Sequence, residues 1–389
     1  MANVRTQLVN DELTVYFGGR VDSANSQEIE DVAMTALQKA APKSLVLDCE
    51  DLAYISSAGL RVLLRLSKVV PRATRIANCQ SPVYDIFEMT GFSEMFEVTR
   101  AMRRLSVEGC ARIGEGSNGI VYRLDSDTIL KAYRNPDALP EIHRERELAR
   151  TAFVLGVPTA IPYDVVRVGE GYGSVFELLD ASSLGELLAA GKKTVDEVAD
   201  MSVELLHQIH ETEVSPESMP SMRVVATDWA LFLRDHLPAP LADKLCELVD
   251  AVPENNHMLH GDFHAKNVMV QNGEALLIDM DTLCHGHPVF ELASTYNAYV
   301  GFGQQDHAAA EAFMGLPYEL MGELWDKTLR GYLGTDDPDA LRSVEDKAAL
   351  VGNARMLRRC IRRDGSPAFA EACRARLEEL IPRVDSLLF

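Results

Sequence analysis

One short polar segment limits the folds open to this chain more than any other feature. It reads His260-Gly-Asp-Phe-His-Ala-Lys-Asn267, and the apolar run Ala275-Leu-Leu-Ile278 follows it and ends in Asp279. Asp262, Asn267 and Asp279 thus bring two carboxylates and one amide oxygen into a single stretch of chain. Taken alone, the segment also fits an accidental polar loop between two strands. Its upstream context decides between these interpretations.

The three side chains match the needs of phosphoryl transfer. That reaction uses one carboxylate to orient the acceptor hydroxyl, and an amide oxygen and a second carboxylate to hold metal ions. The separation of Asp262 from Asn267 is that of the HRDxxxxN loop of kinases. The sequence therefore predicts Asp262 as the catalytic aspartate, with Asn267 and Asp279 as ligands of Mg²⁺.

A glycine-rich turn lies upstream, in the order that a kinase requires. Residues 113–121 contain the pattern GxGxxGxV, formed by Gly114, Gly116, Gly119 and Val121. The turn separates two strand-like runs and does not open a helix, which favours a flap over nucleotide phosphates over a dinucleotide site. Glycine there would let backbone N–H groups approach the phosphate oxygens. A plain hairpin remains the alternative for this motif alone.

A lysine and an acid complete the predicted nucleotide site. Lys131 ends the apolar run Thr128-Ile-Leu, and Glu147 lies on the helix expected from about Pro140 to Leu155. An ion pair between them would hold the ammonium against the α- and β-phosphates of ATP. Glu141 and Glu145 share that helix, so the choice of Glu147 leaves two competing acids.

Residues 107–389 resemble the aminoglycoside phosphotransferase branch of the protein kinase fold, which includes choline and fructosamine kinases. The resemblance depends on HGDFHAKN, LLIDMD and GHPVFELA. It implies an α+β two-lobed domain, with a β-rich lobe at 107–182 and a helical lobe at 183–389. It implies ATP and Mg²⁺ as cofactors, a structural role for Glu291, and a place beside the nucleotide for His264, where protein serine kinases usually carry lysine.

Residues 1–103 resemble STAS domains, the fold of anti-sigma factor antagonists. The matching segments are Gly19-Arg-Val-Asp-Ser-Ala-Asn25, Leu45-Val-Leu-Asp-Cys-Glu50 and Asp51–Arg61. The resemblance implies an α/β domain that binds a protein partner or a second copy of the chain. In antagonists the regulated hydroxyl directly precedes the Gly-Leu pair, whereas here that residue is Ala58. Ser56 and Ser57 remain nearby, either to be modified or to cap a helix.

Composition and charge exclude some classes of binding partner. The net charge of −21 argues against nucleic acid, which requires clustered Lys and Arg. The one basic run, Arg355–Arg363, suits the solvated face of a helix. No apolar stretch is long enough to span a bilayer, and seven scattered cysteines fit a reducing compartment, so we expect a cytoplasmic protein without membrane contact.

Together these features predict an ATP- and Mg²⁺-dependent phosphotransferase that acts on a hydroxyl of a small molecule. Only eleven residues lie between Asp279 and Glu291, too few for the activation segment of ordinary protein kinases. The STAS domain would regulate or dimerise the enzyme. Two alternatives remain: a nucleotide-binding scaffold with little catalysis, and an atypical protein kinase in a STAS partner-switching pathway.

Overall fold

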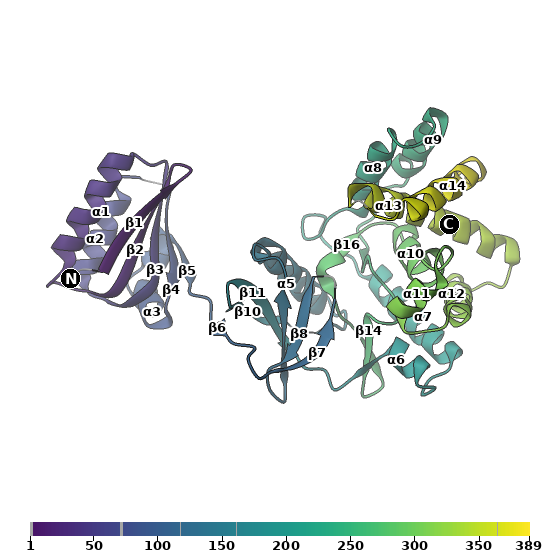
Figure 1. Cartoon of the computed structure of the whole chain (residues 1–389), viewed down its shortest axis with the longest axis horizontal. Coiled ribbons are helices and arrows are strands. Elements are labelled where there is room, and N and C mark those ends of the chain that lie inside the picture. The colour runs from purple at the N-terminus through teal and green to yellow at the C-terminus, as the bar shows by residue number, and fades with distance from the viewer. Residues whose placement is uncertain (1–2, 71–72, 117, 161, 364) are drawn as a thin grey trace. The chain divides into compact units, whose positions relative to one another are not determined.

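The structure is a computed structural model that describes residues 3–70, 73–116, 118–160, 162–363 and 365–389. The chain separates into two compact units, Met1–Leu105 and Ser106–Phe389 (Figure 1). Each unit has its own core of buried apolar side chains. Within the described ranges, no helix is long and apolar enough to cross a membrane.

Unit 1 is built on a five-stranded sheet whose strand order follows the chain. Its strands are β1 (Asn3–Val9), β2 (Glu12–Val21), β3 (Ser44–Ile55), β4 (Thr74–Cys79) and β5 (Glu97–Arg100). β1 and β2 form an antiparallel hairpin, whereas β2 to β5 are parallel neighbours. Parallel neighbours need crossover connections, which explains the alternating strand and helix patterns of this sequence. The predicted α/β class is confirmed.

Helices make those crossovers in unit 1. They are α1 (Ser26–Ala40), α2 (Ser57–Ser67), α3 (Ser81–Met89) and α4 (Phe92–Met95), and the short strand β6 (Arg104–Leu105) ends the unit. α1 and α2 pack on each other, and a bidentate ion pair between Glu30 and Arg65 joins them. Leu63 and Leu66 of α2 are fully buried. Buried apolar side chains and this ion pair therefore hold α2 in place.

Unit 2 begins with a small β lobe. Its antiparallel strands are β7 (Ala111–Glu115), β8 (Gly119–Arg123), β9 (Thr128–Tyr133), β10 (Pro162–Val168) and β11 (Gly171–Glu177), in the spatial order β10-β11-β9-β8-β7. The helix α5 (Leu139–Val154) connects β9 to β10 and packs against β10 and β11. Ile142, Leu148 and Ala149 form its buried face.

Two small sheets lie at the start of the helical lobe. One joins β12 (Ser182–Ser183), β14 (Val268–Gln271) and β15 (Glu274–Leu277), and the other pairs β13 (Met258–Leu259) with β16 (Cys284–His285). The polar segment 260–267 runs from β13 to β14, and Asp279 lies just beyond β15. Short paired strands thus fix both ends of this segment.

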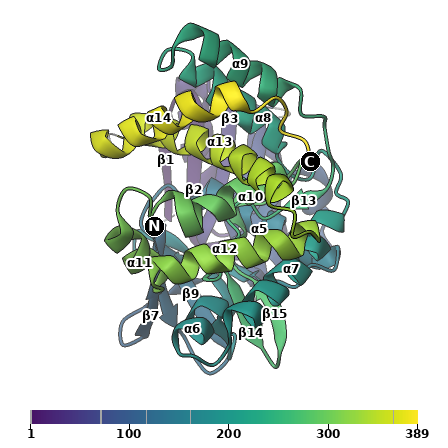
Figure 2. The same cartoon turned by 90° about the vertical axis from the view of Figure 1, so that its right-hand side faces the viewer.

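The rest of unit 2 is helical, as the sequence predicts. Its helices are α6 (Leu184–Ala189), α7 (Val195–Glu211), α8 (Met222–Leu233), α9 (Ala239–Asp250), α10 (Val289–Tyr296), α11 (His307–Met314), α12 (Tyr318–Leu333), α13 (Pro338–Arg362) and α14 (Pro367–Arg383). A 3₁₀ turn, η1 (Met280–Thr282), follows Asp279, and a π turn, η2 (Asn297–Gly301), continues α10. α13 lies beside α14 and packs against α10 (Figure 2).

α13 packs closely against both α10 and the π turn that continues it. Asn297 Nδ2 donates a hydrogen bond to the carbonyl oxygen of Gly352 in α13 (3.1 Å). A Cβ atom at Gly352 would lie only 2.6 Å from Asn297 Oδ1, so a larger residue would push the helices apart. π turns of this kind often occur at functional sites. Arg355, about one turn further along α13, contacts Gly261 of the segment 260–267.

Candidate active site

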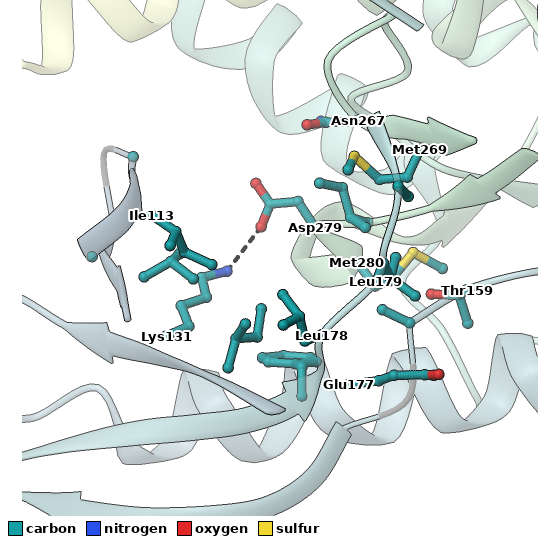
Figure 3. A pocket seen from close by; sticks show the side chains of 18 of the residues that line it. Ile113, Lys131, Thr159, Glu177, Leu178, Leu179, Asn267, Met269, Asp279 and Met280 are labelled. Carbon is teal, nitrogen blue, oxygen red and sulfur yellow. Dashed lines mark hydrogen bonds and ion pairs between the residues drawn. The ribbon is translucent and has the colours of Figure 1, made fainter. Parts of the chain in front are cut away.

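A cavity of about 500 Å³ gathers most of the residues that the sequence predicts for a nucleotide site. Gly116 and Gly119 line it from the glycine-rich turn, and Lys131 lines it from β9. Asn267 and Asp279 line it from the helical lobe. Figure 3 shows Lys131 and Asp279 pointing toward each other inside the cavity. Residues more than a hundred positions apart thus converge on one space.

The remainder of the cavity wall is largely apolar. Its apolar lining includes Ile113, Val121, Phe176, Met269 and Ile278. These side chains come from both lobes, so the cavity has apolar surface on two sides. Such a lining with a few convergent polar groups is typical of a small-molecule site, and its apolar sides suit a flat base.

Lys131 is held between two carboxylates. Its Nζ lies 2.9 Å from Glu145 Oε1 and 2.9 Å from Asp279 Oδ1. Burial alone would lower the pKa of the Lys131 ammonium, but the two carboxylates outweigh it and hold that pKa above its ordinary value. Lys131 is therefore a permanent cation that faces the cavity.

The acid that pairs with Lys131 is Glu145, which corrects the prediction of Glu147. The Glu145 side chain is 5% exposed, and its second oxygen accepts a hydrogen bond from the Tyr133 hydroxyl (2.5 Å). Glu147 is exposed, with its side chain outside this contact. Two positions on a helix are about 200° apart around its axis, so only one of these acids can face β9. The sequence offered both, and the packing of α5 selects Glu145.

Two glycines of the turn, Gly119 and Gly116, have different surroundings. A Cβ atom at Gly119 would lie 2.3 Å from the carbonyl oxygen of Ala132, because β8 and β9 are closely paired there. Around Gly116, by contrast, no atom lies within 4 Å of the Cβ position. Gly119 is thus required by the sheet itself, and Gly116 leaves open space at the cavity wall.

The other members of the turn are also placed near the cavity. Gly114 pairs with Val121 across the β7–β8 hairpin, and Val121 lines the cavity. Asn118 Nδ2 donates a hydrogen bond to Asp281 Oδ2 (3.0 Å), so the tip of the turn reaches η1. Residue 117, inside the motif, lies outside the described residues.

Asp262 and Asn267 occupy opposite ends of one tight loop. Asn267 Nδ2 donates a hydrogen bond to the backbone oxygen of Asp262 (3.0 Å), which fixes the amide and leaves its Oδ1 for other ligands. The Asp262 side chain is 43% exposed. Its carboxylate is therefore open to a reactant from outside.

Glu291 of α10 anchors the backbone of this loop. Its fully buried carboxylate accepts hydrogen bonds from the backbone N–H groups of His260, Gly261 (3.0 and 3.1 Å) and Phe263 (3.4 Å). Burial alone would raise the pKa of Glu291, but the nearby His210 and His260 rings and the backbone N–H of Gly261 hold it below its ordinary value. The structural role that the resemblance implies for Glu291 thus has a physical basis.

Asp279 has an unusual backbone conformation. Its φ is 63° and its ψ is 65°, which is the left-handed region that residues other than glycine rarely adopt. Burial would raise the pKa of Asp279, but the Lys131 ammonium outweighs it and lowers that pKa. Such local strain is typical of functional positions, because surrounding contacts must maintain it. Here α5 packs against η1, directly after Asp279.

His264 is buried beside the catalytic loop. Its Nε2 lies 3.8 Å from Asp262 Oδ2, and its buried Nδ1 has no hydrogen-bond partner among the described residues. Burial lowers the pKa of His264 below its ordinary value, an effect that Asp262 partly offsets. The structure places this ring next to Asp262 and outside the cavity lining, so its predicted place beside the nucleotide stays a prediction.

Arg355 is a site residue that the sequence reasoning missed. Its Nη1 donates hydrogen bonds to the Gly261 carbonyl oxygen (2.9 Å) and to Ser294 Oγ (3.2 Å). The basic run that contains it was expected to be solvated, yet Met356 and Leu357 in the same run are buried. The available signal was this mixture of arginines and apolar residues, which shows that part of the run faces inward.

The donor atoms in the cavity fit Mg²⁺. Magnesium prefers oxygen ligands and is usually held by one or two side chains together with substrate phosphates. Asp279 supplies a carboxylate and Asn267 supplies its free amide oxygen. In the described part of the chain, no cluster of three His, Cys, Asp or Glu residues could hold a metal alone. An ion here would therefore depend on nucleotide phosphates as well.

The STAS-like turn in unit 1 is a helix cap. Ser56 precedes α2, and its Oγ accepts hydrogen bonds from the N–H groups of Ala58 (3.2 Å) and Gly59 (3.5 Å). Ser57 is the first residue of the helix and is exposed. Gly59 packs closely against β2 and β3, where a Cβ would lie 2.6 Å from Ile55 Cγ1. Of the two serines, Ser56 is the one with a clear structural role.

Sequence comparisons agree with the division of the chain into two units. Residues 109–327 match the phosphotransferase enzyme family, and residues 3–104 match the STAS domain. A Bordetella bronchiseptica protein named as an anti-sigma factor antagonist, BtrV, is 34% identical over 86 residues, which is 21% of this chain and 73% of that protein.

Structural comparisons identify kinases among the similar chains. The GDP and kanamycin complex of APH(2")-IIia is 15% identical, covers 77% of this chain and 98% of its own, and has a TM-score of 0.49. A choline/ethanolamine kinase family protein from Mesorhizobium loti is 17% identical over 70% of this chain and 87% of its own, with a TM-score of 0.47. Amicoumacin kinase hAmiN is 14% identical; the match covers 77% of this chain and 94% of that kinase, with a TM-score of 0.46.

Proposed function

Because this chain belongs to the phosphotransferase enzyme family, we propose that it transfers the γ-phosphoryl group of ATP to a hydroxyl of a small molecule, with Mg²⁺ as cofactor. One observation carries the proposal. Lys131, Asn267 and Asp279 converge in a single cavity, and Asn267 is hydrogen-bonded to the backbone of Asp262. These are the cation, the two oxygen donors and the carboxylate that the reaction needs.

The residues would divide the chemistry as follows. Lys131, fixed by Glu145, binds the nucleotide phosphates. Asp262 orients the acceptor hydroxyl and accepts its proton as the new bond between oxygen and the γ-phosphorus forms. The bond from the γ-phosphorus to the bridging oxygen breaks, and ADP leaves. Asn267 and Asp279 would hold Mg²⁺, which neutralises charge on the phosphates.

Calorimetry of ATP binding tests this proposal on the full-length chain. We expect binding that depends on Mg²⁺, and we expect Asp279→Asn to remove that dependence and weaken affinity, because the variant lacks a charged ligand. Glu319→Gln on α12 is a surface control and should bind as the wild type does. Equal Mg²⁺-dependent affinity in Asp279→Asn and the wild type would reject Asp279 as a metal ligand.

The N-terminal domain supports a role in protein contact. Its relative BtrV is named as an anti-sigma factor antagonist, so we propose that this STAS domain binds a protein partner or a second copy of the chain. Under that proposal the enzyme would be regulated through unit 1. The seven cysteines are all free thiols, which supports a cytoplasmic location. A partner-switching protein kinase remains the second candidate, favoured by the same relative.

A further inference from the structure

Five arginines crowd the C-terminal end of α13 in a chain whose net charge is −21. They are Arg355, Arg358, Arg359, Arg362 and Arg363. Arg355 binds the Gly261 carbonyl oxygen, and Arg358 forms an ion pair with Asp228 of α8. The other three have no carboxylate within 4 Å among the described residues. Clustered like charges repel one another, so this arrangement needs an explanation.

One of the unpaired arginines, Arg359, lies near Asp262. Arg355 contacts Gly261, the residue before Asp262, and Arg359 follows four positions later on the same face of the helix, roughly 6 Å along its axis. Partial burial and the charges of Arg363 and Arg355 lower the pKa of Arg359, while Asp262 opposes them. Arg359 thus lies in the electrostatic field of the catalytic carboxylate.

This group lies outside the nucleotide cavity. None of the five arginines is among the residues that line the cavity, and the cation facing the nucleotide there is Lys131. Asp262 is also outside the cavity lining, and its side chain is partly exposed, so an acceptor can reach it from outside the cavity. A guanidinium there would attract an anionic group by paired hydrogen bonds and would repel an ammonium group.

We infer that the phosphoryl acceptor carries an anionic group, a carboxylate or a phosphate, which Arg359 and Arg363 bind while Asp262 orients the hydroxyl. This inference depends on the proposed function and specifies its substrate class. An acidic hydroxy compound would neutralise the arginine cluster as it binds, which explains why no carboxylate of the described chain does so. Arg355 would position the loop from behind, through Gly261.

The first test offers the full-length protein matched acceptors that differ in charge. Glucosamine, glucose and glucuronate form one set, and ethanolamine, glycerol and glycerate form another; ADP release is measured with each. We expect the acids to be preferred. Arg359→Gln should raise KM for an accepted acid roughly 10-fold or more, and Arg359→Glu should shift the preference toward the amine. Preference for an amine in the wild type would overturn the inference.

The control for these variants lies on the same helix. Arg342→Gln changes an exposed arginine roughly 25 Å away along α13, so acceptor preference should not change. A separate measurement of ATP affinity shows whether Arg359 binds the anionic group of the acceptor or the transferred phosphoryl group. If Arg359→Gln weakens ATP binding as much as acceptor binding, Arg359 serves the transferred phosphoryl group and the inference is wrong.

A second test does not require turnover. With the nucleotide cavity filled by Mg²⁺ and a non-hydrolysable ATP analogue, inorganic phosphate is titrated while NMR follows the arginine Nε–H signals. We expect a saturable shift that Arg359→Gln abolishes and Arg342→Gln retains. A missing shift, or the same shift in Arg359→Gln, would reject the anion site. Failure of the analogue to bind would instead reject the proposed function, so the two failures are distinguishable.

Discussion

Lys131 contacts one acid of α5 and not another only two positions away. Glu145 faces β9 and is fixed by Tyr133, whereas Glu147 reaches solvent. The distinction has consequences for function, because a buried ion pair that loses one partner leaves a charge uncompensated. The two acids therefore form a natural matched pair for mutagenesis.

Replacing these acids one at a time should separate their roles. We expect Glu145→Gln to weaken Mg·ATP affinity about 10-fold or more, because Lys131 loses its buried counter-ion. Glu147→Gln should leave that affinity unchanged. Isothermal titration calorimetry on both variants provides the measurement. If Glu147→Gln has the larger effect, the geometry described for α5 is wrong.

Asp262 has a separable role in the chemical step. Asp262→Asn keeps the size of the side chain but cannot accept a proton, so turnover should fall roughly 10²-fold or more while ATP affinity is kept. Slow ATP hydrolysis provides a readout even before an acceptor is known. Turnover at the wild-type rate in this variant would remove Asp262 from the mechanism.

At the scale of elements, the catalytic loop is shaped by helices that follow it in the sequence. α10 supplies Glu291 and Ser294, η2 supplies Tyr299, whose hydroxyl accepts a hydrogen bond from Ala265 N–H (2.8 Å), and α13 supplies Arg355. A loop with its backbone groups bonded in this way is preorganised before any ligand arrives. Its geometry therefore depends on the packing of α10 against α13.

Because of Glu291, the free energy of unfolding should depend on pH. Its pKa is lowered in the folded state, so its stabilisation is present above the unfolded value of about 4.3 and is lost as pH falls through the folded pKa. Glu291→Gln should lower the free energy of unfolding at pH 7 by about 2–4 kcal/mol, because a neutral amide cannot accept from all these donors.

Thermal unfolding followed between pH 7 and pH 3 measures this effect. The loss of stability in acid should be steeper for the wild type than for Glu291→Gln, which has already lost the contribution. Glu319→Gln should follow the wild type throughout. Parallel pH profiles for the wild type and Glu291→Gln would show that Glu291 does not titrate differently on folding.

At the scale of the whole molecule, an enzyme unit and a STAS unit share one chain, each with its own core. The STAS turn carries Ala58 where antagonists of this type are expected to carry a hydroxyl, and Ser56 uses its oxygen as a helix cap. We therefore expect this domain to act through contacts and not through phosphorylation of the turn.

Mass spectrometry tests that expectation. After incubation with Mg·ATP, alone and in a cell extract, intact and peptide masses should show no phosphate on Ser56 or Ser57. The exposed Ser57 is the competing candidate, because phosphate would bring about −1.5 to −2 charges to the N-terminus of α2. Stoichiometric phosphate that disappears in Ser→Ala variants would contradict the prediction.

The sequence by itself determined the fold class and the order of the site elements. The spacing of Asp262 from Asn267, the apolar strand before Asp279 and the glycines between strands are local patterns, and local patterns survive without knowledge of packing. The tertiary structure alone decided which acid faces Lys131 and what holds the catalytic loop. Those answers depend on how helices rotate and pack, so Glu145 and Arg355 became identifiable only when distant segments came together.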